Sequence, residues 1–192
     1  AGILRSTTAN GYPGLFAVSG CVFRDNGNGI IYNNSGAEIA VRIDTSVDRC
    51  VFVDNTESGI KSAGSAYYGV DVINSIFVDN AGYGIELDRT PLYVTEHHNF
   101  FYNNTSGPVT TSYLTRDSSD VDLSGDPFTS YATGDFSLNN TAGAGASVRA
   151  VASSSDWVDT ATTGYLDGGA AQHADPAGGG GGGPVMGGMV VR

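Results

Sequence analysis

The sequence has few positive charges, few cysteines and no long apolar run. Nine of its 192 residues are Lys or Arg, against twenty Asp or Glu, so the formal net charge is −11. Proteins that bind nucleic acids neutralise phosphates with clustered Lys and Arg, and this composition therefore argues against a nucleic-acid partner. No apolar run approaches the roughly 18 residues that a membrane span needs, which predicts no membrane insertion.

Glycine and short repeats are what the sequence has in abundance. Gly occurs 28 times, and a six-residue pattern recurs at spacings of 29, 25 and 24 residues. Its four occurrences are 21–26 (CVFRDN), 50–55 (CVFVDN), 75–80 (SIFVDN) and 99–104 (NFFYNN). A glycine and then an apolar residue follow each block, and a further apolar stretch completes the cycle. The repeating unit is therefore a short strand, a turn built on Asn, a Gly, and further short strands.

The length of the unit selects the architecture. About 24 residues fit three short strands with their turns, whereas helical solenoids need roughly 33 to 47 residues per repeat. The sequence thus predicts an all-β chain whose units stack as rungs, spaced about 4.8 Å apart. We expect one column of stacked turn residues and one column of core residues, namely Asn26, Asn55, Asn80 and Asn104, and Phe23, Phe52, Phe77 and Phe101.

Alternation along the first strand assigns the neighbouring columns. Cys21 and Cys50 point inward with the Phe column, on adjacent rungs and within disulfide range. Parallel in-register side chains rarely point correctly for a bond, so we predict two free, buried thiols. The outward column contains Val22, Val51, Ile76 and Phe100 and is unusually apolar. Either the two faces are reversed, or such sheets tolerate aliphatic residues, or a partner subunit or a loop of the same chain covers this face.

These blocks resemble the right-handed parallel β-helix family, the pectate-lyase-like superfold, which has the same strand–Asn–Asn–x–Gly–Ile cadence. A later stretch is similar to the closing segment of such proteins, with Asp126-Pro127-Phe128, then 134–138 (GDFSL) and 164–172 (GYLDGGAAQ). The resemblance implies a β-helix over 1–173, with about six rungs and a closing segment at 126–173. Residues 174–192 then form a Gly-rich C-terminal arm.

The family includes pectate lyases, polygalacturonases, alginate epimerases and phage tailspike glycosidases, but their motifs are incomplete here. The chain has no Asp-Asp, no Gly-His-Gly, no Arg-x-Lys and no Asp-Pro-His-Glu. The absence of these motifs favours a protein that is not an enzyme, and no cofactor is predicted.

Two polar clusters are the weak candidates for a site. The first is Glu86, Asp88, Arg89, Glu96 and His97, with His98 beside them, because a His flanked by acids can act as a base. The second is Asp117, Asp120, Asp122 and Asp126, because oxygen-rich clusters can bind Ca²⁺. A polar solenoid loop and a solvated turn are the simpler interpretations of the two clusters.

The tail suggests assembly. Gly178 to Gly183 form a six-glycine run, ordinarily a flexible linker, and an apolar segment follows it: Pro184, Val185, Met186, Met189, Val190 and Val191. We expect this arm to dock on a neighbouring subunit and to add a strand through 189–191.

These observations favour a structural β-helix protein at the surface of a virion, such as a capsid decoration or tail-fibre protein. Its expected partners are copies of itself, for instance in a trimer, or other structural subunits. The alternative is a secreted carbohydrate-active enzyme or glycan-binding module. Either function implies an extracellular or virion-surface location.

Overall fold

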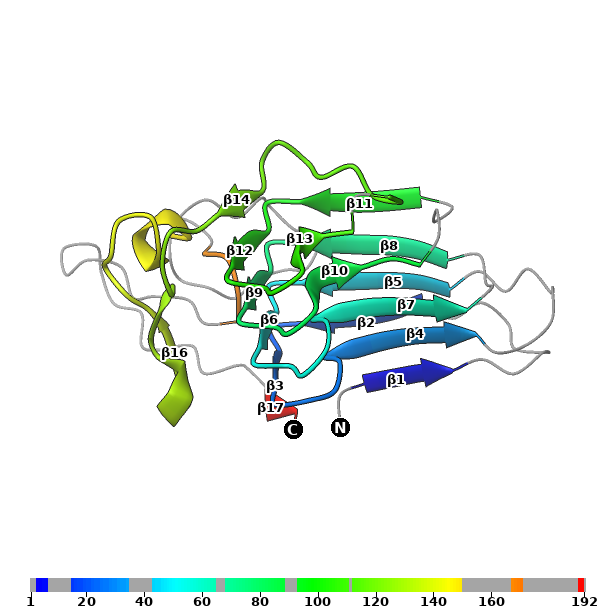
Figure 1. The fold of residues 1–192 in the computed structure, drawn as a ribbon, viewed down its shortest axis with the longest axis horizontal. Coiled ribbons are helices and arrows are strands. Elements are labelled where there is room, and N and C mark those ends of the chain that lie inside the picture. The colour runs from blue at the N-terminus through cyan, green and yellow to red at the C-terminus, as the bar shows by residue number, and fades with distance from the viewer. Residues whose placement is uncertain are drawn as a thin grey trace, which may run out of the picture.

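The structure is a computed structural model that describes residues 3–6, 15–34, 43–64, 68–88, 93–110, 112–149, 167–170 and 190–191. Within these residues the chain is an all-β parallel solenoid (Figure 1), which confirms the predicted fold class. Three parallel sheets form its walls, and strands from successive repeats lie next to one another in each sheet.

Each wall takes one strand from each repeat. Sheet A runs in the order β1 (Ile3–Ser6), β4 (Ile30–Asn34), β7 (Ile60–Gly64), β10 (Tyr83–Glu86) and β13 (Gly107–Val109). Sheet B contains β2 (Leu15–Ser19), β5 (Ile43–Asp48), β8 (Tyr68–Ile73) and β11 (Tyr93–His97). Sheet C runs in the order β17 (Val190–Val191), β3 (Val22–Arg24), β6 (Val51–Val53), β9 (Ile76–Val78), β12 (Phe100–Tyr102) and β14 (Val121–Asp122).

The Phe column fills the interior of the solenoid. The rings of Phe23, Phe52, Phe77 and Phe101 stack nearly parallel, with centroids 4.9, 4.8 and 5.1 Å apart. These distances match the spacing of hydrogen-bonded strands. The glycine after each of the first three blocks makes room for the next ring; a Cβ at Gly59, for example, would lie 2.7 Å from Phe77. The repeated glycine therefore reflects a close approach between backbone and ring.

The Asn column forms a hydrogen-bonded ladder beside the Phe stack. Asn55 Nδ2 donates to Asn80 Oδ1, and Asn80 Nδ2 donates to Asn104 Oδ1, both at 2.7 Å. The backbone is left-handed one position before the ladder Asn, at Asp54 and Asp79 (φ +53° and +52°) and at their counterparts in the other rungs. Asp tolerates this conformation as Asn does, so the chain turns immediately before each member of the ladder.

The outward column of sheet C is buried by the C-terminal part of the same chain. Val51 and Ile76 are fully inaccessible, and they pack against Phe128, Leu138 and Val148. The packing residues come from β15 (Phe128–Ser130), β16 (Asp135–Leu138) and the turns beyond them, and β15 pairs with β16 in the antiparallel sense. Short 3-10 helices follow these two strands, at Tyr131–Thr133 and Gly145–Ser147. The described parts of the predicted closing segment thus form an outer layer and a second core.

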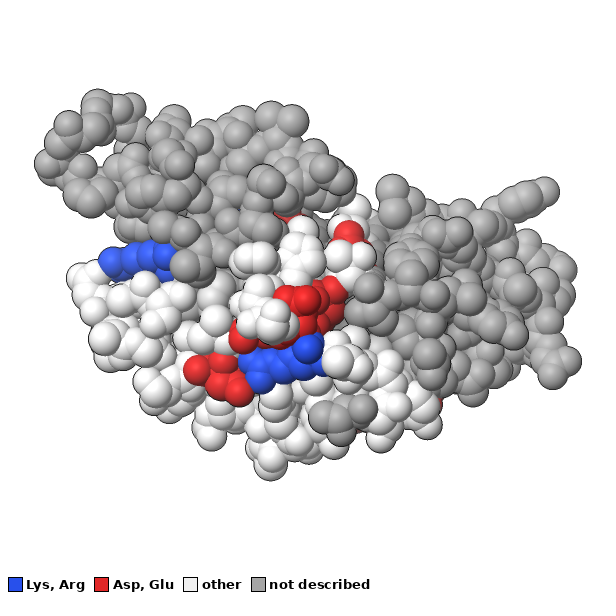
Figure 2. Space-filling view, turned by 90° about the horizontal axis from the view of Figure 1, so that it is seen from above, with Lys and Arg blue, Asp and Glu red and all other residues white. Residues whose placement is uncertain are grey.

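The two ends of the solenoid differ. At the β12 end, residues 112–120 lead to β14 across the end of the solenoid and form its cap. Acidic and basic side chains lie next to each other on the described surface there (Figure 2). At the other end, β17 pairs with β3 in parallel and is the last strand of sheet C (Figure 1). The rest of the predicted arm, including Gly178 to Gly183 and Pro184 to Met189, lies outside the described residues.

Candidate functional site at the capped end

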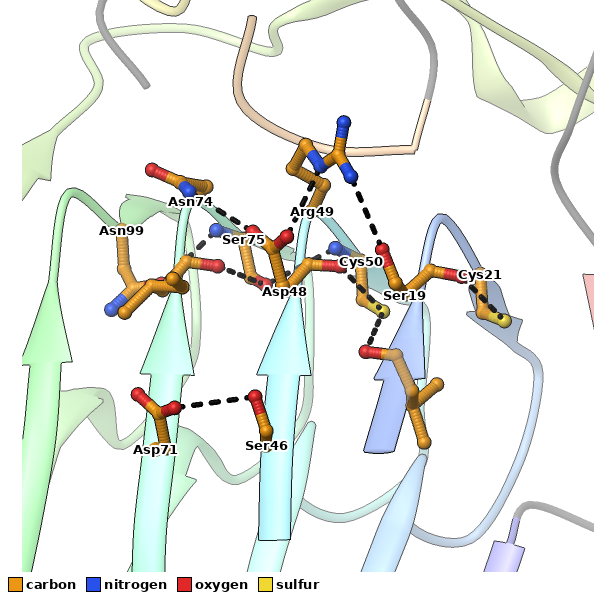
Figure 3. A network of polar contacts seen from close by, with 12 residues as sticks. Ser19, Cys21, Ser46, Asp48, Arg49, Cys50, Asp71, Asn74, Ser75 and Asn99 are labelled. Carbon is orange, nitrogen blue, oxygen red and sulfur yellow. Dashed lines mark hydrogen bonds and ion pairs between the residues drawn. The ribbon is translucent and has the colours of Figure 1, made fainter. Parts of the chain in front are cut away.

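A column of small polar residues leads along the corner between sheets B and C to the capped end (Figure 3). In each rung a backbone N–H of this column donates to the side chain of the next member: Cys50 to Ser75 Oγ (3.1 Å), Ser75 to Asn99 Oδ1 (3.0 Å) and Asn99 to Asp120 Oδ1 (2.7 Å). Asp120 is therefore the last member of the column that begins with Cys21 and Cys50. Cys21 and Cys50 are buried and form no disulfide with each other, and burial raises the pKa of Cys50.

The same corner contains a buried ion pair. The Asp48 carboxylate is inaccessible, lies 3.2 Å from Arg49 Nε and accepts a hydrogen bond from Asn74 Nδ2 at 2.9 Å (Figure 3). Arg49 and Asn74 both have the left-handed backbone that turns the chain at this corner. These polar side chains therefore bind one another and stabilise the stack.

Glu96 occupies a core position at the last rung. It is in register with Val72 in β8, which is in register with Val47 and in turn with Val18, and these valines are buried in the inner core. Glu96 itself is 6% exposed. A carboxyl group therefore stands where the preceding rungs have an apolar side chain, directly beneath the capping segment.

Glu96 and Asp120 form a buried carboxyl pair. Glu96 Oε2 accepts the backbone N–H of Asp117 at 3.1 Å. Burial, together with the hydrogen bond to Asp120 and the charge of Asp120, raises the pKa of Glu96 to about 9. Glu96 Oε1 and Asp120 Oδ2 are buried and accept no other hydrogen bond within the described part of the chain. A proton on Glu96 can bridge these two oxygens, and the raised pKa keeps Glu96 protonated at neutral pH.

Arg116 fastens the capping segment over the core. Its guanidinium lies 4.9 Å from the ring centre of Phe101, the last member of the Phe stack. Arg116 Nε is 3.6 Å from Asp120 Oδ2, and Nη1 donates to Asp122 Oδ2 at 2.8 Å. This cation offsets the charge of the carboxyl pair while it covers the end of the aromatic stack.

A histidine pair lies beside the carboxyl pair. His97 Nδ1 is 2.9 Å from His98 Nδ1, so one ring donates and the other accepts. The left-handed backbone of His98 (φ +56°) accompanies this unusual meeting of adjacent side chains. The N–H of His98 donates to Ser119 Oγ, and Ser119 Oγ donates to Asp117 at 2.6 Å. Hydrogen bonds from Ser119 hold the pKa of Asp117 below its ordinary value.

The structure therefore joins parts of both predicted clusters and separates the remainder. Glu96 and His97 from the first cluster meet Asp117 and Asp120 from the second, and Asp122 joins them through Arg116. Glu86 is the last residue of β10 in sheet A and accepts from Ser58 Oγ at 2.6 Å; Asp88 lies just beyond β10 and accepts from Ser62 Oγ at 2.9 Å. Arg89 lies outside the described residues. Asp126 accepts the N–H of Phe128 in the outer layer, away from the cap.

An acidic row along the other corner was missed, although each of the first three blocks contains its Asp. Asp25, Asp54 and Asp79 follow sheet C on successive rungs, and burial together with the charges of Asp79 and Asp25 raises the pKa of Asp54. Tyr131 donates to Asp79 Oδ2 at 2.6 Å and ties the outer layer to the row. Arg24 lies 3.1 Å from Asp25.

The chemistry of the capped end is that of a closed polar cluster. Within the described ranges, no three His, Cys, Asp or Glu side chains are placed to hold a metal ion. Asp120 has a fully buried side chain and Glu96 is nearly so, so a ligand would have to displace the cap to reach them. The pair can hold a proton and fix the cap, and it is not open to solvent.

The fold and these columns define a parallel β-solenoid protein with one capped end. Comparison with models of known protein families, with curated proteins and with solved structures gives no match. The described residues contain no helix with the length and apolar character to cross a membrane.

Proposed function

We propose that this chain is a non-catalytic structural β-helix protein of an ordered assembly, and that its C-terminal arm docks on neighbouring subunits. A virion surface component, such as a capsid decoration or tail-fibre protein, is the class of assembly that this proposal favours. It places the protein outside cells or on a virion surface.

The observation that carries the proposal is the strand pairing at the uncapped end. Val190 pairs with Val22 and Val191 with Phe23, both in parallel. Strand edges with unpaired backbone groups recruit further strands, and addition of an extended segment to an edge is a general mode of protein association. An arm that can satisfy such an edge within one chain has the chemistry to satisfy the same edge on another.

The polar side chains give secondary support. Asp48, the Asn ladder and the Glu96–Asp120 pair are buried and bonded to neighbouring rungs or to the cap. They stabilise the stack and are not arranged around an open site. A solenoid whose buried polar groups bond to one another suits a scaffold better than a catalyst.

Truncation after Asp175 tests this function. The solenoid should fold with an unchanged far-UV circular dichroism spectrum, while the assembled species should disappear from size-exclusion chromatography with light scattering. Full-length and truncated chains are compared over a range of concentrations. Equal molecular masses for the two chains would refute an assembly role for the arm.

One observation favours the alternative of a carbohydrate-active enzyme. Glycoside hydrolysis uses one protonated carboxyl group beside a second carboxyl group, and Glu96, whose pKa is raised, lies beside Asp120. Burial under the cap opposes it. Assay of the full chain and of Glu96→Gln on acidic polysaccharides decides the matter: activity that Glu96→Gln abolishes would establish the enzyme, and we expect none in either chain.

A further inference from the structure

We propose that the edge of β3 is a strand-acceptor site, and that its occupant in the assembly is the Val190–Val191 strand of a second copy of this chain. This inference rests on the proposed assembly function and assigns its contact to one sheet edge, in one register.

The direction of the backbone hydrogen bonds defines the acceptor. Val51 N–H donates to Cys21 O at 2.8 Å, and the equivalent residues of the next rungs repeat this bond at 2.9 Å, Ile76 to Cys50 O and Phe100 to Ser75 O. In each rung the residue after the corner column thus turns its N–H toward the preceding rung. Val22 holds that position in β3. Its N–H therefore points away from β6, toward the place that β17 occupies.

The edge of β3 suits an apolar extended strand. Val22 is 4% exposed and belongs to the apolar cluster between sheet C and the outer layer. Phe23 belongs to the apolar cluster inside the solenoid, so the edge of β3 runs between two apolar clusters. A strand added here continues sheet C between these clusters. β-branched residues favour strands, and the backbone of Val190 and Val191 is in register with Val22 and Phe23.

The connection is long enough to serve either the same chain or another. Nineteen residues separate Ala170 from Val190, and such a segment can reach roughly 60 Å when extended. Six consecutive glycines impose little directional preference on it. Exchange of an identical element between copies conserves every contact and gains a second link when it is reciprocal, so close packing of copies in an assembly favours exchange.

Proline substitutions can disable each partner separately. Val22→Pro removes the N–H that faces the added strand without removing a bond between β3 and β6, and Pro is tolerated at strand edges. Val191→Pro disables the donor strand and leaves the solenoid untouched. Val22→Ala and Val191→Ala are matched controls, because they shorten the same side chains and retain the N–H groups.

The experiment is a complementation test with full-length chains that bear different affinity tags. Alone, Val22→Pro and Val191→Pro should each be monomeric at concentrations where the wild-type chain and both Ala controls assemble. Mixed, one intact edge and one intact arm remain, so the two Pro variants should co-purify as a one-to-one pair. Val191→Pro alone tests the donor even if Val22→Pro fails to fold.

The outcomes separate this inference from the proposed function. If truncation after Asp175 abolishes assembly but both Pro variants assemble normally, the arm binds elsewhere and the β3 edge is not its acceptor. If the Pro variants are monomeric and fail to co-purify, exchange is refuted. A wild-type chain that is monomeric at every concentration overturns both proposals.

Discussion

Replacing Glu96 with Gln should remove a pH dependence of stability that originates in the core. The pKa of Glu96 is about 9 in the folded chain, against an ordinary value of 4.5. Between these pH values the folded chain holds a proton that the unfolded chain releases. The free energy of unfolding therefore falls as the pH rises, by at most about 1.4 kcal/mol per pH unit. Between pH 6 and pH 8 the loss approaches about 3 kcal/mol.

Gln reproduces the protonated form of Glu96 at every pH. Its amide N–H groups can donate to Asp120 as the proton on Glu96 does, and its oxygen can accept the N–H of Asp117. We expect Glu96→Gln to be more stable than the wild-type chain at pH 8, by up to about 5 kcal/mol, with the difference shrinking to less than about 1 kcal/mol at pH 5.

Urea unfolding followed by circular dichroism at pH 5, 6, 7 and 8 measures this effect. Glu86→Gln is the matched control: it makes the same change at a carboxyl group in sheet A and leaves the Glu96–Asp120 pair in place. The reasoning is refuted if Glu96→Gln has the same pH slope as the wild-type chain, or if it is less stable than the wild-type chain at pH 8.

Three further substitutions test the columns and the outer layer by urea unfolding. Asn80→Ala should destabilise the chain by about 3 to 5 kcal/mol, because it leaves buried donors and a buried carbonyl of the preceding rung unpaired; a loss under 1 kcal/mol would contradict the ladder. Gly59→Ala should cost about 1 to 3 kcal/mol, because the new Cβ would lie 2.7 Å from Phe77, and an unchanged midpoint would show that the ring can move aside. Tyr131→Phe should cost about 1 kcal/mol through loss of the hydrogen bond to Asp79, with no change expected if the outer layer is held by apolar packing alone.

The repeat made the stacked columns predictable, since a side chain that recurs in every block must occupy one position on successive rungs. Phe52 and Asn55 could be placed from the sequence for that reason. The buried position of Glu96 was also readable, because alignment with the preceding repeat puts it opposite Val72. The proximity of acids and histidines in the sequence instead directed attention to Glu86, which lies in a different sheet.

The cap could not be predicted, because residues 112–120 do not repeat the sequence pattern of the blocks. The path of this segment over the end of the solenoid is what brings Arg116 into contact with Phe101 and Asp120 into contact with Glu96. The outer layer posed the same difficulty. The apolar column that contains Val51 and Ile76 indicated a covered face. Only the packing of Phe128 and Leu138 in the structure shows that the same chain, and not a partner, covers it.

The three corners of the rung differ in their tolerance of length changes. The number of residues from the buried position of sheet B to the Phe of sheet C is constant, as in Val47 to Phe52 and Val72 to Phe77. The spacing of the blocks, in contrast, varies from 24 to 29 residues. Most of that variation falls between sheet A and sheet B, where neither the Phe stack nor the Asn ladder passes. Loops at that one corner can therefore be lengthened or replaced, and a whole unit can be duplicated, without shifting either column. A single insertion between Phe52 and Asn55 would break both columns at once.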